Sequence, residues 1–250
     1  MPQDYASFPE GMMDAWRALI ADGVLETVDN SHFAKGFDDG VFLIPELFDH
    51  PAVMPLQRKR ELRAMGSMAA TLEPRVAMEV GADKGGTLAH WLACQPTLEK
   101  MVACEYRGTP YKHFFEKAFP QVEFLWLEDS SYSKESWEKV KDFLGAYRFD
   151  FIFLDGDKNA FRKDFALYSP MVRRGGMVFV HDVYDRAGNS RCSADFREFS
   201  RGLTVSLIID LAESVAAKLN ASRGTPSSGC HEDWLRASGD DCGVGVIHID

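Results

Sequence analysis

Five short apolar runs alternate with helical segments between residues 75 and 181, and this alternation constrains the fold of the chain more than any other feature. The runs are Val76–Val80, Met101–Cys104, Val122–Leu127, Phe149–Leu154 and Met177–Val180, and helices are expected between them at Thr87–Cys94, Lys112–Ala118, Ser133–Leu144 and Asn159–Val172. Short, continuously apolar runs are typical of strands buried on both faces. The alternation therefore predicts an α/β fold, with a parallel sheet, right-handed crossovers and helices on both faces.

The segments on either side of this core are less regular. Residues 1–72 are interpreted as a helical N-terminal extension, with helices at Gly11–Leu25 and Pro55–Leu72, and residues 73–250 as the main domain. After residue 183 the expected elements are a helix at Ser193–Phe199, a strand at Leu203–Ile209, a helix at Leu211–Leu219, a loop at Ala221–Gly229 and a last strand at Gly243–Ile249. Arg173–Gly176 precedes a strand, so we expect a helix C-cap and turn there rather than a phosphate-binding loop.

Composition limits the function classes. The net charge of -10 argues against a general nucleic-acid binder, because such proteins usually present a basic surface. The five cysteines show no CxxC pair, which favours reduced thiols in the cytoplasm over a zinc site or a disulfide framework. No signal peptide is evident, and no apolar run approaches the roughly 20 residues of a membrane span. We therefore expect a cytoplasmic protein without a membrane partner, and a homo-oligomer is one open possibility.

Charged residues stand at the ends of two of the expected strands. Asp155, Asp157 and Lys158 follow the fourth strand, and His181-Asp182 follows the fifth. Open α/β sheets bind ligands at the edge beyond the carboxyl ends of their strands. These residues are therefore predicted to share one ligand-binding edge.

A glycine-rich turn, Glu79-Val80-Gly81-Ala82-Asp83-Lys84-Gly85-Gly86-Thr87, joins the first strand to the first helix. Glycine lets a backbone approach a ligand closely, and the following helix N-terminus offers free N–H groups. A plain tight turn is the alternative interpretation. The spacing is not GxGxxG, which weakens a dinucleotide prediction. Acids at Glu79 and Glu105, each ending a strand, favour a nucleoside that carries an amino group and no pyrophosphate.

Taken together, these motifs resemble those of the class I S-adenosylmethionine-dependent methyltransferases. The resemblance covers roughly residues 75–183 and rests on "EVGADKGGT", "VACEY", "LEDSS" and "VRRGGMVFVHD". It implies a Rossmann-like three-layer sandwich with a seven-stranded, mostly parallel sheet and an antiparallel last strand. The cofactor-binding residues that it implies are Glu79, Gly81, Ala82, Gly85, Thr87, Glu105, Tyr106, Asp129, Ser130 and Asp155.

Within that superfamily, "FIFLDGDKNAF" is similar to the metal-dependent small-molecule O-methyltransferases, both the catechol and caffeoyl-CoA type and the cephalosporin-hydroxylase-like and macrolide-sugar type. The first type carries an acid, a Lys three residues later and an Asp-Asn pair after strand five. Here Asp155 and Lys158 match, and His181-Asp182 replaces the pair. The resemblance implies a divalent metal, Mg²⁺, held by Asp155, His181 and Asp182, with S-adenosylmethionine as the methyl donor.

The chemistry needs an acceptor oxygen with a lowered pKa. A divalent cation lowers the pKa of a bound hydroxyl, and carboxylates are the ligands that Mg²⁺ prefers. Lys158 is a candidate base if burial or a cation lowers its pKa. His181 has three interpretations: a metal ligand, a general base in a metal-independent enzyme, or a strand-end histidine that bonds to the backbone.

The sequence leaves the acceptor unnamed beyond a small hydroxylated molecule: a sugar, polyketide, catechol or peptide hydroxyl. Two functions of other classes stay open. One is an NAD-type oxidoreductase on a similar sheet. The other is a binding module that keeps the nucleoside site without the chemistry.

Overall fold

The computed structural model describes residues 57, 59–109, 112–183, 196, 198–208 and 243–250. Its elements are α3 (Lys59–Ala70), β1 (Val76–Val80), α4 (Gly86–Cys94), β2 (Lys100–Cys104), α5 (Lys112–Ala118), β3 (Glu123–Leu127), α6 (Lys134–Leu144), β4 (Phe149–Leu154), α7 (Phe161–Tyr168), the 3-10 turn η3 (Ser169–Met171), β5 (Val172–His181), β6 (Thr204–Ile208) and β7 (Val244–His248). The expected helices at 11–25 and 211–219 and the loop at 221–229 lie outside the described residues, as does most of the one at 193–199.

The seven strands form one sheet in the order β3-β2-β1-β4-β5-β7-β6. β1 to β5 pair in parallel, and β7 is antiparallel to both β5 and β6. The predicted fold class, a mostly parallel sheet with an antiparallel last strand, is confirmed. The order reverses between β1 and β4, because β2 lies on one side of β1 and β4 on the other. Ligands bind α/β sheets at such a reversal.

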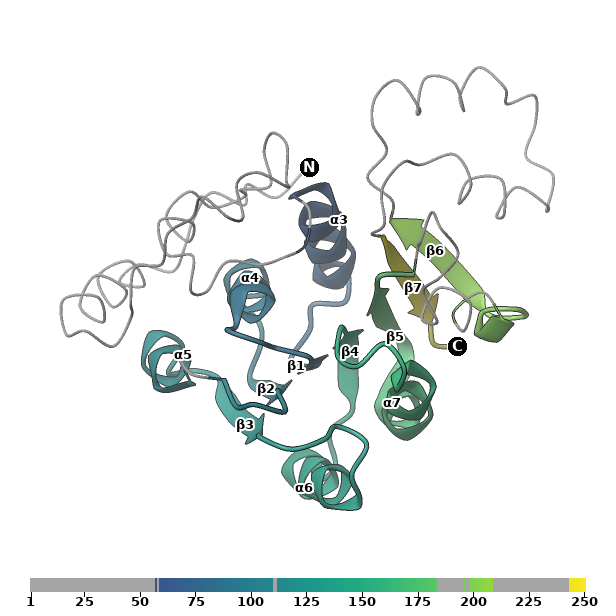
Figure 1. Ribbon diagram of the computed structural model, residues 1–250. Helices are drawn as coiled ribbons and strands as arrows, with labels where there is room; N and C mark the ends of the chain where they lie inside the picture. The colour runs from purple at the N-terminus through teal and green to yellow at the C-terminus, as the bar shows by residue number, and fades with distance from the viewer. Residues whose placement is uncertain (1–56, 58, 110–111, 184–195, 197, 209–242) are drawn as a thin grey trace, which may run out of the picture.

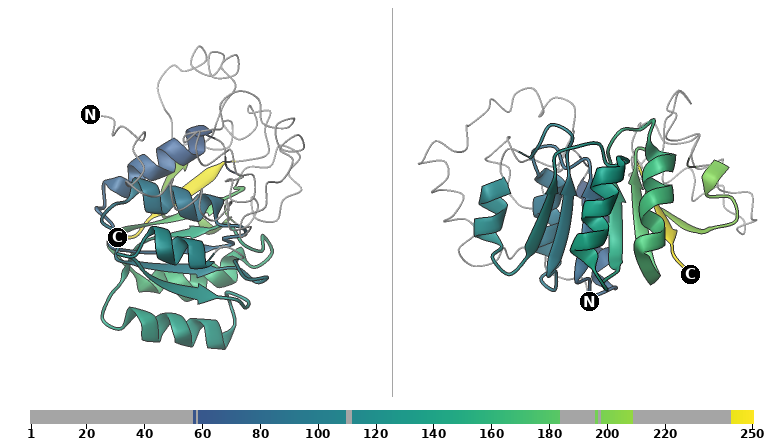
Figure 2. Two further views of the ribbon diagram at one scale, coloured as in Figure 1. Left: turned by 90° about the vertical axis from the view of Figure 1, so that its left-hand side faces the viewer. Right: turned by 90° about the horizontal axis from the view of Figure 1, so that it is seen from below.

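Helices cover both faces of the sheet and make three layers (Figures 1 and 2). One core cluster joins the sheet to α3, α4 and α5, and a second joins it to α6 and α7. Trp91 of α4 is fully buried, with its ring centroid 4.8 Å from that of Phe151 and 5.6 Å from that of Phe179. Among the described residues, no helix combines the length and hydrophobicity that a membrane span requires.

Helix α3 belongs to the same core as the sheet. Leu62, Met65 and Ala69 are buried in the core cluster that also contains the buried residues of α4. The predicted division at residue 72 stays a prediction, since residues 1–56 lie outside the described part. What is described of the extension packs directly on the domain that it precedes.

Two predicted boundaries are wrong around Arg173. The helix expected to reach Val172 ends at Tyr168, and β5 begins at Val172 rather than Met177. Arg173–Gly176 is therefore sheet rather than a helix C-cap. The Gly175 N–H donates to the Ile249 carbonyl at 2.7 Å, and the Ile249 N–H donates to the Gly176 carbonyl at 2.9 Å. Pairing with a segment more than 70 residues away extends the strand, and local periodicity does not record such a partner.

Candidate active site

Residues from the carboxyl ends of β1, β2, β4 and β5 and from the turn after β3 surround a cavity of about 650 Å³. Its lining residues are Val80, Gly81, Asp83, Cys104, Glu105, Tyr106, Asp129, Ser130, Ser131, Tyr132, Asp155, Gly156, Asp157, His181 and Asp182. The cavity lies at the reversal in strand order, and its volume is in the range of ligand pockets. The strand-end charges thus share one edge with the glycine turn, as the sequence predicts.

Gly81 brings two strand ends into close contact. Its φ is +88°, and a Cβ there would lie 2.5 Å from the Asp155 carbonyl oxygen and 2.7 Å from the Gly156 nitrogen. The Gly81 N–H donates to the Cys104 carbonyl at 2.8 Å. Only glycine has both this backbone conformation and this clearance. The turn after β1 therefore lies directly against the turn that carries Asp155.

The predicted cofactor residues divide into two groups. Gly81, Glu105, Tyr106, Asp129, Ser130 and Asp155 line the cavity. The other four, Glu79, Ala82, Gly85 and Thr87, are buried outside its lining. Gly85 has a φ of +89°, and a Cβ there would lie 2.5 Å from the Phe115 ring. Its role is therefore to let α4 begin close to α5.

Glu105 and Asp129 hold the loops of the cavity wall. Glu105 Oε2 accepts a hydrogen bond from the Asp83 N–H at 2.9 Å, so the acid after β2 anchors the glycine turn. Asp129 accepts from the Ser130 N–H at 2.7 Å and from Ser133 Oγ at 2.9 Å, and these bonds lower the pKa of Asp129. Both carboxylates keep oxygen lone pairs for a ligand, since each oxygen accepts more than one bond.

Glu79 is a buried acid beneath this wall. It is 1% exposed, and its Oε2 has no hydrogen-bond partner among the described residues. Burial, and then the neighbouring Asp155 and Glu105, raise the pKa of Glu79 well above the usual range. A buried polar atom of this kind requires a donor from outside the protein, or a proton of its own.

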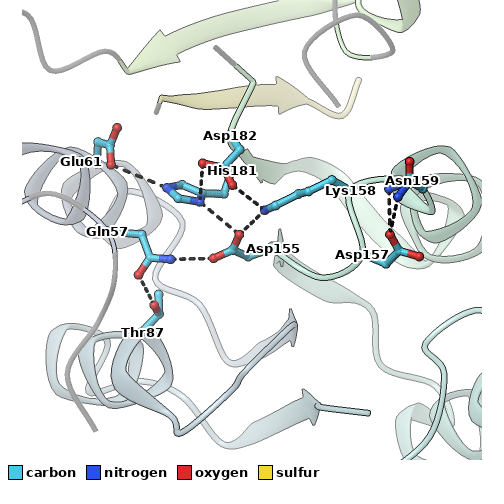
Figure 3. A network of polar contacts seen from close by, with 9 residues as sticks. All are labelled: Gln57, Glu61, Thr87, Asp155, Asp157, Lys158, Asn159, His181 and Asp182. Carbon is cyan, nitrogen blue, oxygen red and sulfur yellow. Dashed lines mark hydrogen bonds and ion pairs between the residues drawn. The ribbon is translucent and has the colours of Figure 1, made fainter. Parts of the chain in front are cut away.

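Asp155, which also lines the cavity, is the centre of a polar network (Figure 3). Its Oδ1 accepts hydrogen bonds from His181 Nδ1 at 3.0 Å and from Lys158 Nζ, and its Oδ2 accepts from Gln57 Nε2 at 2.6 Å. Asp182 lies 3.0 Å from Lys158 Nζ and 3.3 Å from His181 Nδ1. Two carboxylates and two cationic side chains thus form one connected cluster.

The charges of this cluster stabilise one another. Burial opposes every charge in it, but the opposite charges outweigh burial. His181 and Lys158 lower the pKa of Asp155, and His181 lowers the pKa of Asp182. The carboxylates raise the pKa of Lys158, and that of His181 well above its ordinary value. Lys158 and His181 are therefore held as cations, and neither is a free base in this arrangement.

The predicted metal ligands lie together. Asp155, His181 and Asp182 each offer one ligand atom, and these atoms lie within 4.8 Å of one another. Two carboxylates and an imidazole are a suitable donor set for a divalent cation, and the imidazole favours transition metals over Mg²⁺. The residues therefore fit a metal, provided that the Lys158 ammonium gives up its place between the carboxylates and that His181 loses a proton, since only a neutral imidazole binds a metal.

Sequence reasoning missed two site residues, Gln57 and Glu61. Both are buried, at 2% and 0% exposure, and Glu61 Oε2 lies 3.7 Å from His181 Nε2. They precede Asp155 by about 100 residues and match no motif. One signal could have found them. They are polar residues four apart, which share one side of the predicted helix, close in sequence to the apolar Leu62 and Met65 that are buried.

The loop that carries Ser130 and Ser131 rests on a second buried acid. Ser131 Oγ donates to Asp164 Oδ1 at 2.6 Å, and Tyr168 Oη donates to the Ser131 carbonyl. Burial raises the pKa of Asp164 to about 6. An acid with a raised pKa in the folded state is destabilising once it ionises, so part of the stability present below pH 4 is lost as the pH rises toward 6.

We expect Asp164→Asn to remove this loss. The free energy of unfolding of the wild type should fall relative to that of the variant between pH 4 and 6, by on the order of 2 kcal/mol, because one pKa unit corresponds to about 1.4 kcal/mol. Urea titrations across this range measure it. Asp142→Asn, on the exposed face of α6, controls for net charge. Parallel pH profiles for wild type and Asp164→Asn would contradict the assignment.

Solved structures with this architecture include two O-methyltransferases. The O-methyltransferase from Bacillus cereus in complex with SAH is 12% identical, with a TM-score of 0.51 over 97% of this chain and 92% of that chain. The O-methyltransferase TomG from Streptomyces achromogenes, involved in tomaymycin synthesis and in complex with SAM, is 14% identical, with a TM-score of 0.50 over 98% and 92%. No protein-family model and no curated protein matches the sequence. At these identities the similarity establishes the fold.

Proposed function

We propose that the protein transfers a methyl group from S-adenosylmethionine to a hydroxyl oxygen of a small molecule. The observation that carries the proposal is the continuity of the cavity. Its lining includes the Gly81 turn, Glu105 and the Asp129-Ser130 pair, and also Asp155, His181 and Asp182 of the charged cluster. The residues proposed for the cofactor and those proposed for the reaction thus line one cavity, on a fold shared with solved O-methyltransferases.

The cavity wall suits the proposed cofactor. Glu105 has two oxygens that can accept hydrogen bonds from ribose hydroxyls, and Ser130 and Asp129 can contact the base. The Tyr106 ring, 75% exposed and in the cavity lining, can cover a base by stacking. The acids around the cavity favour a ligand with a positive sulfonium and a positive amino group.

Methyl transfer is an in-line displacement in which the C–S bond breaks as the C–O bond forms and the hydroxyl proton leaves. A divalent cation, when bound by Asp155, His181 and Asp182, would lower the pKa of the acceptor hydroxyl. Without a metal, the charges of Lys158 and His181 would instead stabilise the negative charge that develops on an acceptor oxygen bound beside Asp155. Either side chain could accept the hydroxyl proton only after losing a proton of its own, and the ion pairs with the carboxylates oppose that loss by raising its pKa.

A metal-independent methyltransferase is the second candidate. The observation in its favour is the ion pairing of Lys158 with both Asp155 and Asp182, which balances the carboxylates without a metal. In that case His181 would act as the base, an interpretation based on the ordinary pKa of histidine near neutrality, and it would first have to lose the proton that the carboxylates stabilise. We also propose a cytoplasmic location for the protein, whichever mechanism holds. The free thiols of Cys94 and Cys104 support it.

Binding measurements test the cofactor first. We expect S-adenosylhomocysteine to raise the melting temperature and NAD to leave it unchanged. Glu105→Ala should weaken S-adenosylhomocysteine binding about 10- to 100-fold, because it removes the ribose acceptor, as calorimetry measures. Glu128→Ala, an exposed acid paired with Lys112, is the control. A shift caused by NAD alone would favour the oxidoreductase, and a wild type that binds the cofactor without methyl transfer to any hydroxylated acceptor would favour the binding module.

The same screen, repeated with Mg²⁺, Mn²⁺, Zn²⁺ and EDTA, separates the two methyltransferase mechanisms. The metal-assisted mechanism predicts that turnover is lost in EDTA and restored by one of the cations. Turnover that is equal in EDTA and in Mg²⁺ would favour His181 as the base in a metal-independent enzyme.

A further inference from the structure

Gln57, the first described residue of the chain, reaches the reaction centre from the segment before the sheet. Its side chain is buried at 2% exposure. Its Nε2 donates to Asp155 Oδ2 at 2.6 Å, and its Oε1 accepts a hydrogen bond from Thr87 Oγ1. Gln57 therefore joins three segments: its own, the first turn of α4, and the end of β4 (Figure 3).

The chemistry of the partners fixes the orientation of this amide. An ionised carboxylate only accepts hydrogen bonds, so the NH₂ end of Gln57 must face Asp155. The carbonyl end is left for Thr87, whose hydroxyl can donate. Asp155 then has a different partner for each oxygen. Oδ1 faces the cations Lys158 and His181, and Oδ2 faces the neutral amide.

A carboxylate that is held at both oxygens cannot rotate about its Cβ–Cγ bond without losing a hydrogen bond. The bonds to Lys158 and His181 both end on Oδ1, and Gln57 holds the second oxygen, Oδ2. Each oxygen of the carboxylate therefore has its own hydrogen bonds, and a change in its plane would strain the bonds at both. Partners of this kind orient the groups that bind a metal or an acceptor.

We propose that Gln57 is a positioning residue that sets the plane of the Asp155 carboxylate and couples it to α4. The proposal rests on the proposed function in one respect, that Asp155 belongs to the reaction centre. Glu61, four residues later, forms a longer ion pair with His181, with its Oε2 3.7 Å from His181 Nε2. Gln57 and Glu61, in the described segment before β1, thus contact Asp155 and His181.

A merely structural role is the competing explanation, because a buried glutamine can simply join α3 to α4. The chain offers a matched control for that role. Gln95, which follows α4, is also 2% exposed, and its Nε2 donates to the Gly66 carbonyl of α3 at 2.9 Å. Neither glutamine lines the cavity, and of the two only Gln57 donates a hydrogen bond to Asp155. Gln57→Met and Gln95→Met therefore each remove one buried amide of equal exposure.

The experiment compares the two variants in the full chain. We expect Gln57→Met to lower kcat about 10- to 100-fold, the usual effect of removing such a partner, while KM for S-adenosylmethionine changes less than about 3-fold. Gln57→Glu should be worse, because it sets an oxygen against Asp155. Gln95→Met should lower the melting temperature and leave kcat within about 3-fold. If Gln57→Met does not fold, Thr87→Val should lower kcat in the same direction, by about 3- to 10-fold, because it frees the carbonyl end of Gln57.

A spectroscopic readout makes the proposal independent of turnover. In protein labelled with ¹⁵N-histidine, the Nδ1–H proton of His181 reports its bond to Asp155, and His181→Gln assigns the signal. We expect Gln57→Met to shift or broaden this signal and Gln95→Met to leave it unchanged. If the two variants give the same spectrum and the same kcat, Gln57 is structural only. If the wild type transfers no methyl group, the proposed function fails, and the spectrum alone still decides the role of Gln57.

Discussion

Asp155→Asn is expected to lower turnover about 100- to 1000-fold, the effect of removing one preorganised electrostatic partner from a reaction centre. The substitution keeps the shape of the side chain but replaces one oxygen with an NH₂ donor. That donor must face Lys158 and His181 or Gln57, all of which are donors themselves in this structure. The cluster would lose its central acceptor, and with it a ligand for a divalent cation. Steady-state kinetics with a cognate acceptor measure the loss, and calorimetric titration with Mn²⁺ tests the ligand role separately.

The matched control for this substitution is Asp157→Asn. Asp157 lines the same cavity two residues later and accepts a hydrogen bond from the Asn159 N–H, not from the cluster. It should keep turnover within a few-fold of the wild type. Equal turnover for Asp155→Asn and Asp157→Asn would remove Asp155 from the reaction centre and leave the cavity with a binding role only.

Asp155→Asn should also destabilise the fold, in a way that depends on pH. We expect a loss of about 2 kcal/mol at neutral pH, since Lys158 and His181 keep Asp182 as a partner but lose the central one. The lowered pKa of Asp155 means that its contribution is present above the unfolded value, about 3.9, and is lost as the pH falls through the folded value. The stability gap between wild type and variant should therefore close below about pH 4.

The strands could be predicted from the sequence because their burial is continuous. Apart from the acids Glu79 and Asp150, β1 and β4 consist of apolar residues. Both strands begin and end at the residues that the pattern predicts. Asp150 shows why polar residues inside such a run need not break it. Its carboxylate accepts hydrogen bonds from the Arg75 and Val76 N–H groups and from Arg173. The ion pair between Asp150 and Arg173 joins β4 to the first residues of β5. Because these partners lie 23 residues apart, the sequence around Arg173 does not predict where β5 begins.

The edge of the candidate site could be predicted, and its support could not. Strand ends in a parallel sheet meet at one edge whatever the sequence separation, so Glu105, Asp155 and His181 were grouped by topology alone. Gln57 and Glu61 lie near these residues because α3 packs in the same core cluster as α4, and no sequence motif predicts that packing. Likewise, the glycine turn predicts a ligand loop, but only the φ of Gly81 and its distance to Asp155 show that this turn packs against the turn that carries Asp155.

Gly81→Ala should therefore disturb both the Asp155 turn and the part of the cavity lining that we propose for the cofactor. The new Cβ would lie 2.5 Å from the Asp155 carbonyl oxygen, closer than side-chain carbons approach backbone atoms, so one of the two turns must move. The backbone also holds a φ of +88°, which alanine adopts only with strain. We expect the free energy of unfolding to fall by about 3 kcal/mol. We also expect S-adenosylhomocysteine binding to weaken more than about 100-fold, because the displaced turn lines the cavity and its Asp83 N–H is bonded to Glu105.

Gly202→Ala separates the two causes of this effect. Gly202 has nearly the same φ, +87°, and a Cβ there would meet nothing within 4 Å. This variant carries the conformational strain without the collision, so we expect it to lose about 1 kcal/mol and to bind S-adenosylhomocysteine as the wild type does. Calorimetry and urea unfolding on both variants give the comparison. If Gly81→Ala behaves like Gly202→Ala in both measurements, the β1 and β4 turns are not in the contact described, and Gly81 is only a turn residue. If it loses stability without losing the ligand, the turn supports Asp155 but does not hold the cofactor.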